Sequence, residues 1–143
     1  MRDVQNISAA IANKITGVSG LYAVYEYEID KPVNGKYPFA TVTPKSFNGE
    51  FGDTIRNIRH YQFNVRIYQE RTAIGFGNEK AERLMREIVD EIMTAFDADT
   101  TLSGMVKFVK PIEGDLDYVN REIGDTRTAE IVLDAMNVVP SIT

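Results

Sequence analysis

The chain contains no cysteine and only one histidine, His60, in 143 residues. The lack of cysteine excludes disulfides, thiolate catalysis and the usual structural zinc site, and it fits a cytosolic or intracellular assembly origin. A Ser-His-Asp triad or a histidine metal site would have to be built on His60. Because His60 opens a predicted strand on its polar face, a solvated or interface histidine is the preferred interpretation.

Long apolar runs are also missing. No stretch approaches the roughly 20 apolar residues of a membrane-spanning helix, and the chain begins without the apolar core of a signal peptide. The balance of 16 Lys and Arg against 21 Asp and Glu gives a formal net charge of −5. Specific nucleic-acid binding requires a basic stripe that neutralises phosphates, so the composition argues against it. The length predicts a single domain, residues 1–143.

The rest of the chain is predicted to pack around a helix from Asn78 to Phe96. Its apolar residues recur at steps of three and four, which places them on one helix face. They are Ala81, Leu84, Met85, Ile88, Val89, Ile92, Met93 and Phe96. Burying them gains roughly 10–20 kcal/mol, and ordering the backbone costs at least as much, so this helix needs a large apolar surface beside it. We expect that surface to be a sheet.

A first amphipathic helix is predicted from Val4 to Val18, and Gly17 or Gly20 can end it in a left-handed conformation. Apolar alternation and β-branched or aromatic residues predict five strands, over 21–29, 39–43, 60–68, 105–109 and 126–139. The order α-β-β-β-α-β-β indicates an α+β fold. We expect a mostly antiparallel sheet packed on one side by the long central helix and the N-terminal helix.

Two prolines mark the expected ends of strands. Pro44 is predicted to stop the second strand, and Pro111 the fourth. Between them and the following strands we expect an extended loop or hairpin tip over 45–57 and irregular chain over 112–125. Phe47 and Phe51 are unusual in such a polar loop, and an aromatic residue there is either tucked against the fold or offered to a partner.

A glycine pair before the central helix is the one feature that suggests a cofactor loop. Gly75 and Gly77 follow a strand and precede a helix, but Lys80 stands where the dinucleotide motif has its third glycine. A flexible loop is the favoured interpretation, and a small nucleotide-binding enzyme that uses Gly75 to Lys80 is a remote alternative. The acidic pairs that begin at Asp97 and Asp115 lack the EF-hand spacing. The residues therefore predict no catalytic, cofactor or metal site.

Several short phrases together resemble a known family. They are Tyr37-Pro-Phe-Ala-Thr-Val, Phe47-Asn-Gly-Glu-Phe-Gly-Asp53, Val65-Arg-Ile-Tyr-Gln-Glu-Arg71, Asn78-Glu-Lys-Ala-Glu, Met85-Arg-Glu-Ile-Val-Asp-Glu91 and Thr128-Ala-Glu-Ile. The combination resembles the tail terminator proteins of long-tailed bacteriophages, similar to that of phage lambda. The resemblance extends from the first helix to the last strand.

This resemblance implies a structural virion protein rather than an enzyme. Family members form a homohexameric ring that caps the tail tube, ends tail polymerisation and offers a joining surface to the head connector. The implied partners are other copies of the chain, the tail tube protein and connector or neck proteins, with no membrane. DNA is expected to pass through the lumen without specific binding. The implied location is the tail-neck region of a virion assembled in the host cytoplasm. Another neck, head–tail adaptor or head-completion protein is the alternative.

We expect contacts with partners or subunits in the segment from Phe47 to Arg59. The candidates are Phe47, Glu50, Phe51, Asp53, Arg56 and Arg59. Arg56 and Arg59 can pair with acidic groups of a neighbour, and solvated loop charges are the equal alternative.

Overall fold

A computed structural model describes residues 3–29, 38–51, 56–70, 78–120 and 126–140. The elements are α1 (Asp3–Thr16), β1 (Ala23–Tyr25), β2 (Phe39–Phe51), β3 (Arg56–Glu70), α2 (Asn78–Ala98), β4 (Phe108–Asn120) and β5 (Thr126–Pro140). The predicted order and the α+β class are confirmed. Neither described helix has the length and apolarity to span a membrane.

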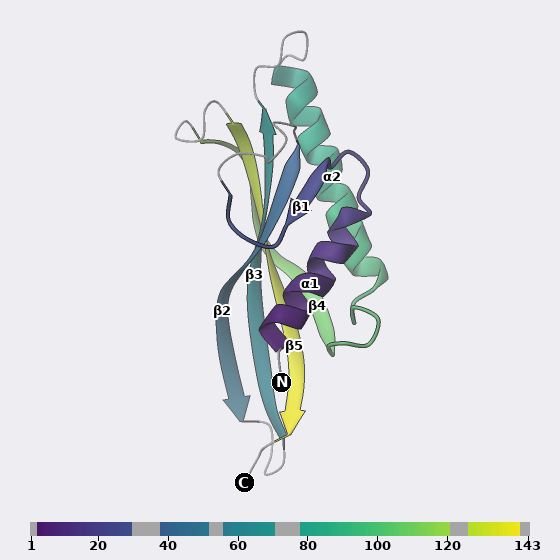
Figure 1. Cartoon of the computed structure of the whole chain (residues 1–143), viewed down its shortest axis with the longest axis vertical. Coiled ribbons are helices and arrows are strands. Elements are labelled where there is room, and N and C mark those ends of the chain that lie inside the picture. The colour runs from purple at the N-terminus through teal and green to yellow at the C-terminus, as the bar shows by residue number, and fades with distance from the viewer. Residues whose placement is uncertain (1–2, 30–37, 52–55, 71–77, 121–125, 141–143) are drawn as a thin grey trace.

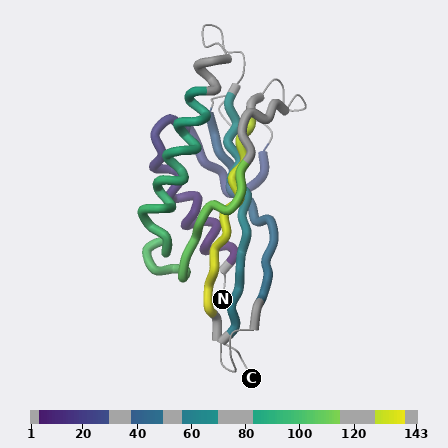
Figure 2. The backbone as a smooth tube through the Cα atoms, turned by 180° about the vertical axis from the view of Figure 1, so that it is seen from behind, coloured from purple at the N-terminus to yellow at the C-terminus, as the bar shows by residue number. Residues whose placement is uncertain are grey.

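The strands form one five-stranded sheet in the order β1-β2-β3-β5-β4. Every neighbouring pair is antiparallel except β1 and β2, which run parallel. Both helices lie on the same side of the sheet, in the front view and from behind (Figures 1 and 2). We call the side that faces α1 and α2 the helix face and the opposite side the outer face.

The core lies between the helix face and the two helices. On β3 the alternating residues Phe63, Val65 and Ile67 are fully buried, as the period-2 pattern predicts. On α2 most of the predicted apolar face is buried, with Ile92 and Phe96 completely enclosed, whereas Leu84 and Met93 are partly buried. The long central helix therefore packs across the sheet in the predicted way.

The expectation that Pro44 and Pro111 end strands is wrong. β2 continues past Pro44 to Phe51, and β4 continues past Pro111 to Asn120, so most of the predicted loop and irregular chain is strand. Each proline stands beside a register shift, between Pro44 and Ser46 and between Pro111 and Glu113. Proline is tolerated at a sheet edge or a bulge because no partner there needs its missing N–H.

The first predicted strand is much shorter than expected. Only Ala23–Tyr25 pair with β2, although the alternation covers Leu21 to Ile29. The chain then passes over β2 on the outer face. The Tyr68 hydroxyl on β3 donates to the Glu28 carboxylate at 2.9 Å, which places Glu28 on that face. The chain therefore leaves the edge of β2 after Tyr25 and reaches the side chains of β3 on the outer face.

The connection between α1 and β1 is fastened to α2. The backbone N–H of Ser19 donates to the Glu91 carboxylate at 2.9 Å. Gly20 has a left-handed φ of +97°, and a Cβ at that position would lie 3.4 Å from Leu84 and Ile88 of α2. Of the two glycines proposed to end α1, Gly20 has the left-handed conformation, although the helix already ends at Thr16.

Candidate functional site

The sheet extends beyond its helix layer at one end. We call Lys45–Phe51 of β2, Arg56–His60 of β3 and Met136–Pro140 of β5 the open half of the sheet. These strand segments run on past the start of α1 in both views (Figures 1 and 2). Every described side chain of β2 from Pro44 to Gly49 is exposed. In the open half β2 is therefore exposed on both faces, whereas the described side chains of β3 and β5 there are mostly half-buried.

A bulge at Lys45 sets which side each residue of this part of β2 faces. Pro44 pairs with Phe63, and Ser46 already pairs with Gln62, so Lys45 is the extra residue. Phe47 then pairs with Tyr61, whose side chain belongs to the core. Opposed residues of an antiparallel pair point to the same side, so Phe47 lies on the helix face. Simple alternation from Val42 would have placed it on the outer face.

Phe47 is the most exposed large apolar residue described, at 77%. Arg59 is exposed on β3, and its register partner on β2 is Gly49. The predicted contacts Glu50, Phe51 and Arg56 lie in the ladder of β2 and β3, at the far end of the same hairpin. Asp53 lies outside the described residues. The structure thus places the candidates on paired strands instead of a loop, and their contacts with partners stay a prediction.

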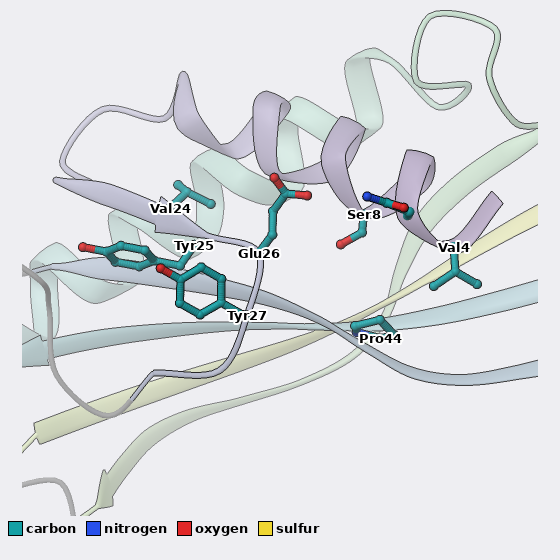
Figure 3. A pocket seen from close by; sticks show the side chains of 8 residues that line it. Val4, Ser8, Val24, Tyr25, Glu26, Tyr27 and Pro44 are labelled. Atoms are coloured by element: carbon teal, nitrogen blue, oxygen red, sulfur yellow. The ribbon is translucent and has the colours of Figure 1, made fainter. Parts of the chain in front are cut away.

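A groove of about 620 Å³ runs between α1 and the sheet edge where β1 ends (Figure 3). Val4 and Ser8 of α1 form one wall, and Tyr25 and Tyr27 form the other. Pro44 closes the end that meets the open half of β2. Tyr27 is 59% exposed, so the groove offers an aromatic surface beside an unpaired strand edge.

A second groove, of about 350 Å³, lies between α2 and the opposite sheet edge. Its walls are mainly apolar and comprise Val89, Met93, Pro111, Ile112, Glu113, Gly114, Glu130 and Ile131. Ile112 is 45% exposed, which is high for a large aliphatic residue in a strand. The periodicity of the chain does not indicate this surface. A proline inside an alternating pattern was the available signal, because proline in a sheet marks an edge strand.

The outer face carries an aromatic and charged cluster beside β1. Phe39 and Tyr68 stack with ring centroids 4.8 Å apart, and Tyr25 meets Phe39 edge-on at 5.8 Å. Burial, followed by the hydrogen bond to Glu28, raises the pKa of Tyr68 from 10.0 to about 12. This part of the outer face is thus not the polar face that simple alternation of β3 predicts, because Phe39 and the Glu28 segment cover Tyr68.

Arg66 of β3 bridges two carboxylates, Glu130 on β5 and Glu28 in the segment after β1. Its Nε donates to Glu130 on β5 at 2.9 Å, and its Nη1 donates to Glu28 at 3.3 Å. The hydrogen bond to Glu130 is the main reason that the pKa of Arg66 is raised. Arg66 thus pairs with two carboxylates of the same chain, and this cluster holds the segment after β1 against β3 and β5.

His60 lies beside a carboxylate, and the serine on the neighbouring part of β2, Ser46, donates its hydroxyl to Gln62 at 3.3 Å. Its Nδ1 is 3.0 Å from Asp134 Oδ2 across β3 and β5. The residues opposite it in the ladder are Asn48 and Met136, and neither is a nucleophile. The described residues include no group of three or more His, Asp or Glu side chains able to hold a metal ion. This arrangement supports a structural interpretation of His60. Gly75 and Gly77 lie outside the described residues.

No protein-family model matches the sequence, and no curated protein matches it. The structure is similar to a chain of a solved particle described as the virion of a native gene transfer agent. The TM-score is 0.59 at 16% sequence identity, and the match covers 94% of this chain and 95% of that chain. At this identity the likeness shows a common fold over almost the whole chain.

Proposed function

We propose that this protein is a structural virion protein that acts as a phage tail terminator. It forms a ring of identical copies that caps the tail tube, ends tail polymerisation and presents the surface to which the head connector binds. The single observation that carries the proposal is the fold shared, over nearly the full length of both chains, with a component of a virion particle.

Three features of the chain support this role. The open half offers paired strands with exposed faces, which suit contacts with neighbours better than a closed core does. Both sheet edges adjoin grooves, and the groove beside β4 has mainly apolar walls. The formal net charge of −5 disfavours binding of DNA. A ring through which DNA passes must not hold the DNA in place.

Deletion of the gene from the phage or phage-like particle that encodes the protein tests the proposal. Electron microscopy of negatively stained lysates is expected to show tails of uncontrolled length without heads, and expression of the protein in trans should restore joined tails of normal length. Normal tails in the deletion strain would refute the terminator role.

The same experiment distinguishes the second candidate, a neck or head-completion protein of the connector, which the shared fold supports equally. Loss of that protein should leave filled heads without tails beside free tails of normal length. Tail length therefore decides between the two roles.

A further inference from the structure

The two edges of the sheet run in opposite directions. From β2 through β3 and β5 to β4, each neighbouring pair is antiparallel, so β2 and β4 are antiparallel to each other. A second copy in the same orientation can therefore place its β2 beside the β4 of the first copy and continue an antiparallel sheet. Such a head-to-tail contact, repeated with closure, builds a ring.

Both edges are open where this contact needs them. β1 pairs with β2 only at Phe39–Thr41, which leaves β2 without a described partner on that side from Val42 onward. On β4 the Val109 N–H is already taken by the Thr100 carbonyl at 2.6 Å. Among the described residues, no further backbone bond reaches the outer edge of β4 beyond that point.

We propose that the β2 edge of one copy binds the β4 edge of the next copy, with Phe47 inserted into the groove between α2 and β4. The inference rests on the proposed ring and names the surface that joins its subunits. Phe47 projects from the helix face, and Val89 and Met93 of α2 form the wall of the groove on that same face. An aromatic ring that is 77% exposed in one copy thereby meets apolar walls in the next.

Charge favours the same alignment. When the strands are counted antiparallel with Phe47 opposite Pro111, Lys45 falls beside Glu113, and both side chains are exposed in the single copy. The head-to-tail contact therefore brings opposite charges together.

The alignment also implies a stagger. Within one copy Phe47, Tyr61, Ala135 and Val109 lie level across the sheet. Pairing Phe47 with Pro111 instead of the level of Val109 shifts the neighbour by two residues along the strands, and a sheet that closes on itself requires such a shear. Because Pro44 and Pro111 supply no N–H, the ring of Phe47 and the charge pair should provide most of the affinity.

A disulfide trap tests the contact directly, since the natural chain has no cysteine. The trap variant carries Lys45→Cys and Glu113→Cys. In one copy these positions lie on opposite sheet edges with two strands between them, about 14 Å apart from the spacing of strands, which is too far for a disulfide. A matched control carries Lys45→Cys and Glu87→Cys, because Glu87 is exposed on α2. Both variants are oxidised in two forms, once in assembled tails and once as concentrated purified protein.

On non-reducing gels the trap variant is expected to give a ladder of linked copies, and the control should give monomers. A ladder that ends at one ring-sized species supports closure. The absence of a ladder above the control, in assembled tails or in protein that self-associates, overturns the inference.

Equilibrium sedimentation gives a second measure. Phe47→Ala is expected to weaken self-association about tenfold or more, the usual range for an aromatic interface anchor. Lys45→Glu and Glu113→Lys should each weaken it, and their combination should restore it. If all these variants associate like the wild-type protein, the contact is wrong.

The outcomes separate this inference from the proposed function. If the cysteine variant gives a ladder but deletion of the gene leaves tail length normal, the terminator role is refuted and the interface stands. Overlong tails on deletion, with no ladder on assembled tails, would refute the interface alone.

Discussion

The same strands build a core at one end of the molecule and a surface at the other. The ladder of β3 and β5 is continuous from Arg56 opposite Pro140 to Glu70 opposite Thr126. At the helix-covered end Phe63 and Ile67 are fully buried, whereas in the open half Arg59 is exposed. Backbone pairing therefore continues without a second layer, but burial does not. The difference shows that the helix layer defines the core, and that the strands beyond it are available to neighbours.

The largest expected effect contrasts an aromatic residue from each end. Phe63→Ala should lower the free energy of unfolding by about 3–5 kcal/mol, because it leaves a cavity between the sheet and the helices. Phe47→Ala should change it by no more than about 0.5 kcal/mol, since the side chain is already in solvent. Urea denaturation of both variants at a protein concentration that keeps the chain monomeric provides the measurement.

Equal losses in the two variants would mean that Phe47 is packed in the monomer, and the contrast between the covered and open ends would fail. Phe47→Leu serves as a control that keeps a large apolar side chain, and its free energy of unfolding should also stay close to that of the wild-type protein.

A glycine from each region gives the next contrast. Gly20→Ala should destabilise the protein by about 1–2 kcal/mol, because an alanine with φ of +97° is strained and its Cβ would touch Leu84 and Ile88. Gly49→Ala should be neutral or stabilising by about 0.5–1 kcal/mol, because Gly49 is in a strand and no atom lies within 4 Å of the added Cβ. Thermal unfolding of the two variants side by side measures the difference. A stabilising Gly20→Ala would show that the α1–β1 connection is not held against α2.

Tyr68 sharpens the comparison within the outer face, because it is buried where most of that face is polar. Tyr68→Phe should cost about 0.5–1.5 kcal/mol at neutral pH through loss of the hydrogen bond to Glu28. The pKa of Tyr68 is raised from 10.0 to about 12 on folding, so its contribution is complete below pH 10 and declines as the pH approaches 12. Denaturation series across this range should show the wild-type protein losing its advantage over Tyr68→Phe. A constant difference would place the hydroxyl in solvent.

The smallest effect belongs to the ion pair between α1 and the end of α2. Lys14 Nζ lies 2.8 Å from Asp99, and this hydrogen bond, with a second from the Ser103 N–H, lowers the pKa of Asp99 below 3.8. Asp99→Asn should lower the melting temperature slightly at neutral pH. The stabilisation is present above pH 3.8 and is lost as the pH falls through the lowered pKa, so the two melting temperatures should converge in acid. Glu87→Gln, on the exposed face of α2, is the control that should show no such convergence.

Periodicity predicted the helices and strands that have one apolar face, and it failed at the register shifts within β2 and β4. The apolar spacing from Leu84 to Phe96 defined α2, and alternation from Tyr61 to Ile67 defined the core side of β3. The same reasoning ended two strands at Pro44 and Pro111, because a proline cannot donate to a ladder. It did not anticipate that Pro44 lies where β2 extends beyond β1 and Pro111 on the edge strand β4, each next to a register shift, where no donor is needed.

The candidate contacts were predicted in the same uneven way. An aromatic residue in a polar stretch singled out Phe47 and left open whether it packs on the fold, and the structure shows it exposed. The groove that includes Met93 and Ile112 was not predicted, because its walls come from α2 and β4, and periodicity says nothing about which surfaces those two elements bring together.

The amino-acid sequence by itself determined which residues share a face, because helix and strand periods are local properties of the backbone. It also determined the absence of thiol chemistry and the acidic balance. Only the tertiary structure decided that β5 lies between β3 and β4, that β2 is left as an edge beyond the short β1, and that the bulge at Lys45 turns Phe47 to the helix face. Strand order and register depend on contacts between segments far apart in the chain, and a repeating pattern within each segment carries no information about its neighbour.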